Sequence, residues 1–232
     1  MPIARASAPY LSACALVALA AFTGWRCCRH PALMAVTVAA LAVGAAFAWF
    51  FRDPERRFRA APAIVLSPGD GRVMRVMVAG NRRVIEVFLA IWNVHIQRAP
   101  VGGRVTAVDY TKGAYLAAFN PAAGTRNTRC RSVIRFSRGE VAVTQVAGLI
   151  ARKVECWLTP GRTVERGSRM GLIHLGSQVR VEVPLGARIL VKPGDKVKGG
   201  LTPVAELRAR ARSRPRVRAR SRPRVRARNG RR

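Results

Sequence analysis

Three residues that are distant in the chain carry the groups of an activated serine. Asp70 lies in SPGDGRV, His95 in WNVHIQRAP and Ser177 in GLIHLGSQV. A carboxylate, an imidazole and a hydroxyl could make the serine oxygen a nucleophile, with His95 as the base and Asp70 as its partner. Each residue also has an ordinary interpretation, because Asp-Gly favours turns and a histidine in an apolar segment is usually a hydrogen-bonded core residue.

Ser177 follows a glycine inside a segment that otherwise alternates as a strand does. Residues 171–183 read GLIHLGSQVRVEV. Glycine weakens a strand interior and often marks a bulge or a close approach of the backbone. The pair Gly176–Ser177 is therefore either a loose point in a sheet or a place where the backbone adopts a special conformation.

Charge and cysteine content limit the classes of partner. The 232 residues include 42 Lys and Arg against 11 acidic residues, for a net charge of +31. Residues 208–232 hold 13 arginines and no acid, so subtracting them leaves +18 for the rest. This excess favours an anionic lipid surface or nucleic acid. Five cysteines without framework or metal-binding spacing favour a reducing compartment over a disulfide scaffold or zinc.

Two apolar segments near the N-terminus predict a helical hairpin in a membrane. Residues 10–25 are uncharged, and residues 32–51 give 20 uncharged residues, about the length of a bilayer span. More arginines follow the second segment than lie in the turn, which puts the N-terminus and the main domain on the cytoplasmic side. The alternative is a cleaved signal peptide over residues 1–23.

From Ala63 onward the sequence predicts a β-rich domain, because short β-branched runs alternate with Gly- and Pro-containing turns. Residues 113–127 lack strand character and predict a short helix and loop. PGRTVERG (160–167) and PGDKVKGG (193–200) share a pattern, which suggests two similar hairpin units in one barrel or sandwich. Biotinyl/lipoyl-type carrier domains have similar hairpins, but no lysine here has their displayed setting.

The C-terminal residues 208–232 predict a disordered tail. SRPRVRAR occurs twice in succession, at 213–220 and 221–228. Arg-rich segments without a core-forming pattern do not fold alone. Such a tail could bind nucleic acid nonspecifically or lie on anionic headgroups.

Five motifs occur in order along the chain: FRDPER (51–56), SPGDGRV (67–73), WNVHIQRAPVGGRV (92–105), QVAGLIARKV (145–154) and GLIHLGS (171–177). Together they resemble the short, bacterial-type phosphatidylserine decarboxylases. The resemblance covers roughly residues 48–207 and extends to the N-terminal hairpin, and the Arg-rich tail has no counterpart in it. Gln178 stands where many members have Thr or Ser, and Trp92 stands where longer members have a second histidine.

The resemblance implies that the chain cuts itself between Gly176 and Ser177. A β chain would end at Gly176, and an α chain of 56 residues would begin at Ser177 and pair with it as a heterodimer, with further oligomerisation left open. Ser177 would become a pyruvoyl group that forms a Schiff base with phosphatidylserine. His95 would act as general base and acid, and Asp70 would orient it. No metal or pyridoxal phosphate is expected.

The sequence therefore predicts a mainly β, barrel- or sandwich-like decarboxylase of an anionic inner membrane. Its expected parts are a membrane hairpin (1–52), the decarboxylase domain (53–207) and the tail (208–232). Tyr115, Leu116 and Phe119 could form an apolar lip toward the lipid. One alternative is a membrane-anchored serine hydrolase that uses Ser177, His95 and Asp70. The other is a nonenzymatic basic adaptor for membranes or nucleic acid.

Overall fold

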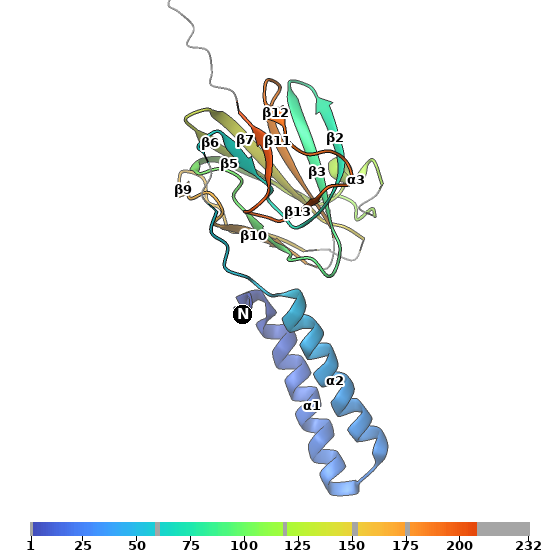
Figure 1. Cartoon of the computed structure of the whole chain (residues 1–232). Coiled ribbons are helices and arrows are strands. Elements are labelled where there is room, and N and C mark those ends of the chain that lie inside the picture. Colours follow the sequence, from blue (N-terminus) through green and yellow to red (C-terminus); the bar gives the residue numbers. More distant parts are fainter. Residues whose placement is uncertain (1, 59–60, 118–119, 150–152, 175–176, 208–232) are drawn as a thin grey trace, which may run out of the picture.

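A helical hairpin stands below a β-rich domain in the computed structural model, which describes residues 2–58, 61–117, 120–149, 153–174 and 177–207 (Figure 1). Helix α1 (Ala8–Cys28) and helix α2 (Pro31–Phe50) pack side by side, after a short 3₁₀ turn η1 (Arg5–Ser7). Both are apolar and long enough to cross a membrane. The expected pair of helices is confirmed, although α1 begins earlier and ends later than the predicted segment, and the place of the pair in a membrane stays a prediction.

The two helices begin and end at residues that commonly start and stop helices. Proline occupies the first turn of both helices, where its missing N–H costs no hydrogen bond. Between the helices, Arg29 adopts a left-handed conformation with φ of 53°, which ends α1. The His30 side chain then accepts a hydrogen bond from the Ala32 N–H at 3.3 Å and caps α2.

The domain is mainly β, as the alternating runs predict, and its strand pairs are antiparallel. Three sheets have the strand orders β13-β2-β3-β11-β7-β6-β5-β9, β4-β10-β8 and β1-β14-β12. The largest sheet curls around the core (Figure 1). The only helix described within this domain is the short α3 (Ala123–Arg126), in the segment predicted as helix and loop. The strands are β1 (Ile64–Leu66), β2 (Gly71–Ala79), β3 (Arg82–Leu89), β4 (Ile96–Arg98), β5 (Gly103–Thr111), β6 (Arg129–Phe136), β7 (Gly139–Val146), β8 (Val154–Cys156), β9 (Thr163–Val164), β10 (Arg169–Ile173), β11 (Ser177–Pro184), β12 (Arg188–Ile189), β13 (Lys196–Val197) and β14 (Pro203–Glu206).

The repeated P-G-x-x-V-x-x-G pattern corresponds to two equivalent places in the eight-stranded sheet. The first copy contains β9 and the second contains β13, which are the two edge strands of this sheet. Val164 pairs with Gly103, and Val197 pairs with Gly71. A Cβ on either glycine would overlap a carbonyl oxygen of the next strand, so each site requires glycine. The repeat therefore marks two similar edge positions of one sheet, but the expected hairpins are not found among the described residues, because β9 pairs with β5 and β13 pairs with β2.

Candidate active site

Ser177 begins the central strand β11, which lies between β3 and β7. Ser177 pairs with Leu89 at the end of β3, and Gln178 is buried and pairs with Val146 of β7. The alternating valines Val179 and Val181 are fully buried in the core, so their burial fixes the register of the strand. Gly176 lies outside the described residues.

Two chain crossings between sheets meet beside Ser177. One leads from Leu89 of β3 through a turn to Ile96 of β4, and the other leads from Ile173 of β10 to Ser177. The Ile173 N–H donates a hydrogen bond to the His95 carbonyl oxygen at 3.2 Å. Ile173 is thus bonded to His95, and Ser177 is paired with Leu89. Ser177, the residue after the predicted cleavage site, therefore lies beside the end of β3, where the turn that leads to His95 begins.

The His95 imidazole is fully buried, and its protonation pattern follows from its neighbours. Its Nδ1 lies 2.9 Å from the Asn93 carbonyl oxygen, and its ring packs against Phe50 with centroids 4.2 Å apart. A carbonyl oxygen can only accept a hydrogen bond, so Nδ1 carries the proton in the neutral ring. This leaves Nε2 as the basic nitrogen, which is the form that a general base needs.

The pKa of His95 is lowered to about 4, chiefly because burial disfavours the charged ring. The Asn93 carbonyl raises the pKa, Arg52 lowers it, Asp70 raises it and His174 lowers it. Burial exceeds the other contributions, so His95 is neutral near pH 7. The charge of Asp70 thus acts on His95 in the direction expected of its partner.

Asp70 lies in the turn between β1 and β2 and is itself buried. Its carboxylate accepts hydrogen bonds from both terminal nitrogens of Arg56, one of them at 2.8 Å to Oδ2. The Gly199 N–H donates to Oδ1 at 2.7 Å. These bonds fix the carboxylate by charge pairing and a backbone donor. Whether Asp70 orients His95, as the resemblance implies, stays a prediction.

Sequence reasoning missed the ion pairs of the linker that joins α2 to the domain. Asp53 pairs with Arg98 at 2.9 Å and also with Arg169 of β10. Arg56, three residues later, holds Asp70. FRDPER could have indicated these ion pairs, because acidic and basic residues lie close together there, directly after an apolar helix. The linker therefore fixes the hairpin end against strands that lead to the site.

Sequence reasoning also assigned no role to His174, three residues before Ser177. His174 is buried, its Nε2 lies 3.1 Å from Glu155 Oε1, and its Nδ1 lies 3.4 Å from the Tyr10 hydroxyl of α1. Burial lowers its pKa, while Glu155 raises it. These three residues line a cavity of about 590 Å³ at the junction of the hairpin and the domain, together with Lys153 and Arg169.

The other expected features stand as follows. Tyr115 is 39% exposed and Leu116 is partly buried, while Phe119 lies outside the described residues. Within the part of the chain that the structure describes, no cluster of three or more His, Cys, Asp or Glu could hold a metal ion. The Arg-rich tail, residues 208–232, lies outside that part.

Comparison with known proteins agrees with the resemblance in the motifs. The family profile described as phosphatidylserine decarboxylase matches residues 43–205. A protein of Symbiobacterium thermophilum named phosphatidylserine decarboxylase proenzyme is 41% identical over 88% of this chain and 95% of its own length. Proteins of the same name from Burkholderia multivorans and Burkholderia ambifaria are 41% identical over 79% of this chain and 94% of theirs. The chain therefore belongs to the phosphatidylserine decarboxylase family.

Proposed function

We propose that this protein decarboxylates phosphatidylserine to phosphatidylethanolamine, with a pyruvoyl group that it makes from its own Ser177. The observation that carries the proposal is that Ile173 contacts His95 and Ser177 pairs with Leu89, in a member of this family. Ile173 is bonded to His95 itself, and Leu89 lies at the start of the turn that leads to this neutral imidazole with a basic Nε2. The names of the relatives, which are proenzymes, support a chain that matures by cleavage.

His95 is the proposed base for self-cleavage. Its Nε2 takes the proton of the Ser177 hydroxyl, and the oxygen attacks the Gly176 carbonyl carbon. The peptide C–N bond breaks and an ester C–O bond forms, which is an N→O acyl shift. Elimination then releases the Gly176 carboxylate and leaves dehydroalanine at position 177. Addition of water releases ammonia and leaves a ketone at the new N-terminus.

In the reaction with substrate, the ketone would bind the amine of phosphatidylserine and would serve as the sink for the electrons released with CO₂. His95 is the proposed acid that returns a proton to the substrate carbon after the carboxylate has left. General acid catalysis of this kind contributes roughly 10²–10⁴-fold to a rate. Asp70, held by Arg56 and Gly199, supplies a fixed negative charge that favours the protonated form of His95.

After cleavage the two chains should remain a heterodimer, because strands of one lie between strands of the other. Residues Ser177–Pro184 pair with β3 on one side, and residues 178–182 pair with β7 on the other. Farther along the α chain, β13 pairs with β2, and β14 pairs with β1. Separation would break these ladders and expose the valine core of β11, so the fragments should not dissociate under native conditions.

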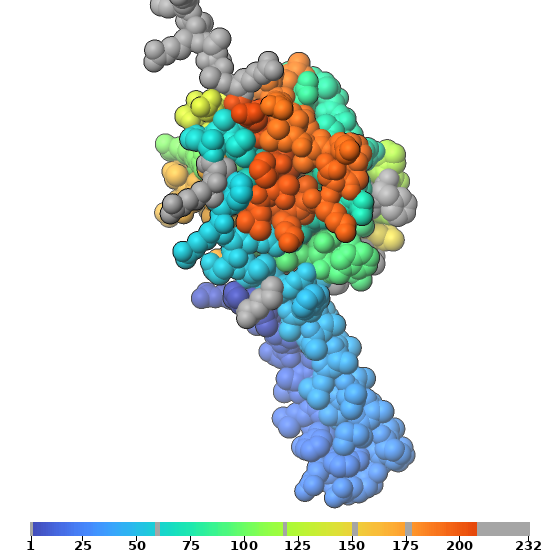
Figure 2. All heavy atoms as spheres, viewed as in Figure 1, coloured from blue at the N-terminus to red at the C-terminus, as the bar shows by residue number. Residues whose placement is uncertain are grey.

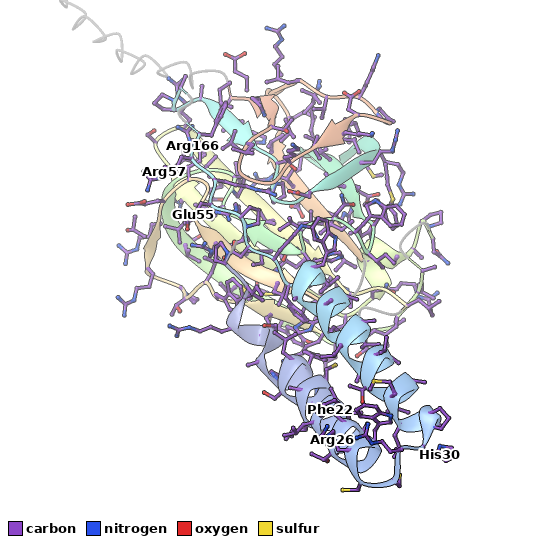
Figure 3. All side chains as sticks on the ribbon, turned by 60° about the horizontal axis from the view of Figure 1, so that its bottom comes forward. Phe22, Arg26, His30, Glu55, Arg57 and Arg166 are labelled. Atoms are coloured by element: carbon purple, nitrogen blue, oxygen red, sulfur yellow. The ribbon has the colours of Figure 1, made fainter. Side chains whose placement is uncertain are left out.

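The helical hairpin supports a place in the inner membrane, and the arginines that follow α2 support the cytoplasmic side for the domain. Phe22, Arg26 and His30 lie toward the hairpin end away from the domain, while Glu55 and Arg57 lie on the domain (Figure 3). A diacyl lipid does not leave the bilayer readily, so an anchored site meets its substrate at the interface. The positive charge of the protein would attract an anionic leaflet.

The intact mass of the denatured full chain, beside that of Ser177→Ala, tests the proposal. We expect two chains that separate between Gly176 and Ser177, the smaller about 17 Da lighter than the plain peptide because ammonia is lost. Ser177→Ala should stay one chain and release no CO₂ from phosphatidylserine. One uncut chain in both samples would reject the proposal, and labelling by an active-serine probe would then favour the hydrolase alternative.

A further inference from the structure

The turn that leads to His95 carries two exposed apolar side chains at its tip. Ile91 is 56% exposed and Trp92 is 67% exposed. The turn is closed by two hydrogen bonds, from the Ala90 N–H to Asn93 Oδ1 at 2.9 Å and from the Asn93 N–H to the Ala90 oxygen at 2.8 Å. Scattered apolar residues are normal on protein surfaces, but adjacent Ile and Trp on a closed turn form a protruding apolar tip.

This tip is tied to the end of the hairpin that adjoins the domain. Arg52 donates hydrogen bonds to the Trp92 carbonyl oxygen at 2.6 Å and to the Trp49 carbonyl oxygen at 2.8 Å. Its guanidinium lies 4.3 Å from the centre of the Trp49 ring, which is 61% exposed in the last turn of α2. Figure 2 shows green residues of the domain against the upper end of the blue hairpin. Tryptophan is enriched at both faces of a bilayer, so Trp49 marks the level at which α2 leaves the membrane.

The surface next to the tip is cationic. A cavity of about 570 Å³ is lined by Trp92 and Phe88 and by three cations, Arg72, Lys196 and Lys198. Asp70 also lines it, but Arg56 pairs with this carboxylate. Each Lys or Arg near an anionic leaflet contributes about 1 kcal/mol of attraction. An apolar tip beside a cationic cavity is complementary to an anionic bilayer. The tip matches the acyl chains, and the cavity matches the phosphate groups above them.

We propose that Ile91 and Trp92 insert into the leaflet at the level where α2 ends, and that the cavity with Arg72, Lys196 and Lys198 faces its anionic headgroups. The inference rests on the proposed function, which places the hairpin in a bilayer. His95 follows Trp92 by three residues, so this contact holds the proposed base at the headgroup layer. A lipid can then reach the site without leaving the membrane.

Fluorescence quenching in reconstituted full-length protein tests the placement without using activity. Trp25→Phe, Trp49→Phe and Trp157→Phe together leave Trp92 as the only tryptophan. In vesicles of phosphatidylcholine and phosphatidylglycerol with brominated acyl chains, Trp92 should lose most of its emission and be shielded from aqueous iodide. The matched control adds Trp92→Phe and Val78→Trp. Val78 is 62% exposed and is the last residue but one of β2. Strand β2 ends on the side of the domain away from the hairpin (Figure 1), so a tryptophan at this position should respond only to iodide.

A kinetic comparison provides a second test in case the tryptophan variants do not fold. The ratio of kcat/KM for phosphatidylserine in vesicles to kcat/KM for a monomeric short-chain phosphatidylserine should fall roughly tenfold in Ile91→Ala/Trp92→Ala. Val78→Ala should keep the wild-type ratio. Quenching of Trp92 by iodide alone, or an unchanged ratio in the double variant, would overturn the inference. Wild-type protein inactive on both substrates would reject the proposed function, while the quenching result would still decide the placement.

Discussion

Arg56 donates hydrogen bonds from both terminal nitrogens of its guanidinium to the carboxylate of Asp70. Arg56 belongs to the linker after α2, and Asp70 belongs to the turn before β2. The same guanidinium donates a hydrogen bond to the Gly199 carbonyl oxygen at 2.7 Å, and the Gly199 N–H donates to Asp70. One arginine therefore joins the linker, the turn and a segment of the proposed α chain around the acid of the site.

Removal of Arg56 should destabilise the protein strongly. Arg56→Leu leaves a buried carboxylate that has lost its cation, and loss of one partner of a buried pair costs roughly 3–5 kcal/mol. We expect the thermal midpoint of the full chain in detergent to fall by roughly 10 °C. Arg57→Leu is the matched control, because Arg57 is exposed and such changes usually stay within about 0.5 kcal/mol. Equal midpoints for the two variants would contradict a structural role for the Arg56–Asp70 pair.

Gly71 should not tolerate even a methyl group. Its φ is +153°, and a Cβ there would overlap the carbonyl oxygen of Phe88 in the neighbouring strand. Gly71→Ala must therefore displace the start of β2 and with it Asp70, which is the preceding residue. We expect a lower thermal midpoint and slower appearance of the two cleaved chains on a denaturing gel. Gly186→Ala should match wild type in both assays, since nothing lies within 4 Å of a Cβ at that site. Normal cleavage in Gly71→Ala would show that the strand can shift without disturbing Asp70.

Patterns local in the sequence predicted the main elements of the fold. The alternation of VRVEV puts Val179, Val181 and Val183 into the core, where all three are fully buried. The apolar segments predicted the helical hairpin, and the repeated glycine-containing pattern marked two similar edge positions of the sheet, although not the β-hairpins that it suggested. Each of these predictions uses the spacing of apolar residues or glycines within one helix or strand, and this spacing can be read from the sequence.

The surroundings of the proposed catalytic residues could not be predicted in the same way. His95 is buried because Phe50 of α2 packs on it, and no periodicity in the sequence indicates that contact. The partner of Asp70 is one of 42 basic residues, and only the path of the linker selects Arg56. The motifs located His95 and Asp70, but the environment that sets their charges comes from elements that meet only in the folded chain.

The lowered pKa of His95 predicts a loss of stability at mildly acidic pH. The folded pKa is about 4 and the unfolded pKa about 6.5, so between these values the unfolded chain binds a proton that the folded chain does not. The contribution of neutral His95 to the free energy of unfolding is complete above pH 6.5. It falls by up to about 3 kcal/mol as the pH decreases to 4. Thermal midpoints across this range should fall less in His95→Gln than in wild type. His174 also has a lowered pKa and accounts for part of the loss that remains. Parallel curves for the two proteins would argue against a neutral buried His95.

Phe50 should set the pKa of His95, because its ring covers the imidazole at 4.2 Å and burial is the largest cause of the shift. Phe50→Ala admits water, so the pKa should rise from about 4 toward the ordinary 6.5. Nuclear magnetic resonance titration in detergent can follow it, since the chain has only 3 histidines and His→Gln variants assign each signal.

Phe47→Ala is the matched control for that titration. Phe47 lies in the same helix and packs on Tyr10 with ring centroids 5.0 Å apart, and its described ring contacts do not include His95. Phe47→Ala should leave the pKa of His95 at its low value of about 4. In decarboxylation assays, the acid limb of the rate profile should move to higher pH in Phe50→Ala alone, because the base becomes protonated earlier. If both variants moved the limb equally, the hairpin as a whole, and not the Phe50 ring, would control the charge of His95.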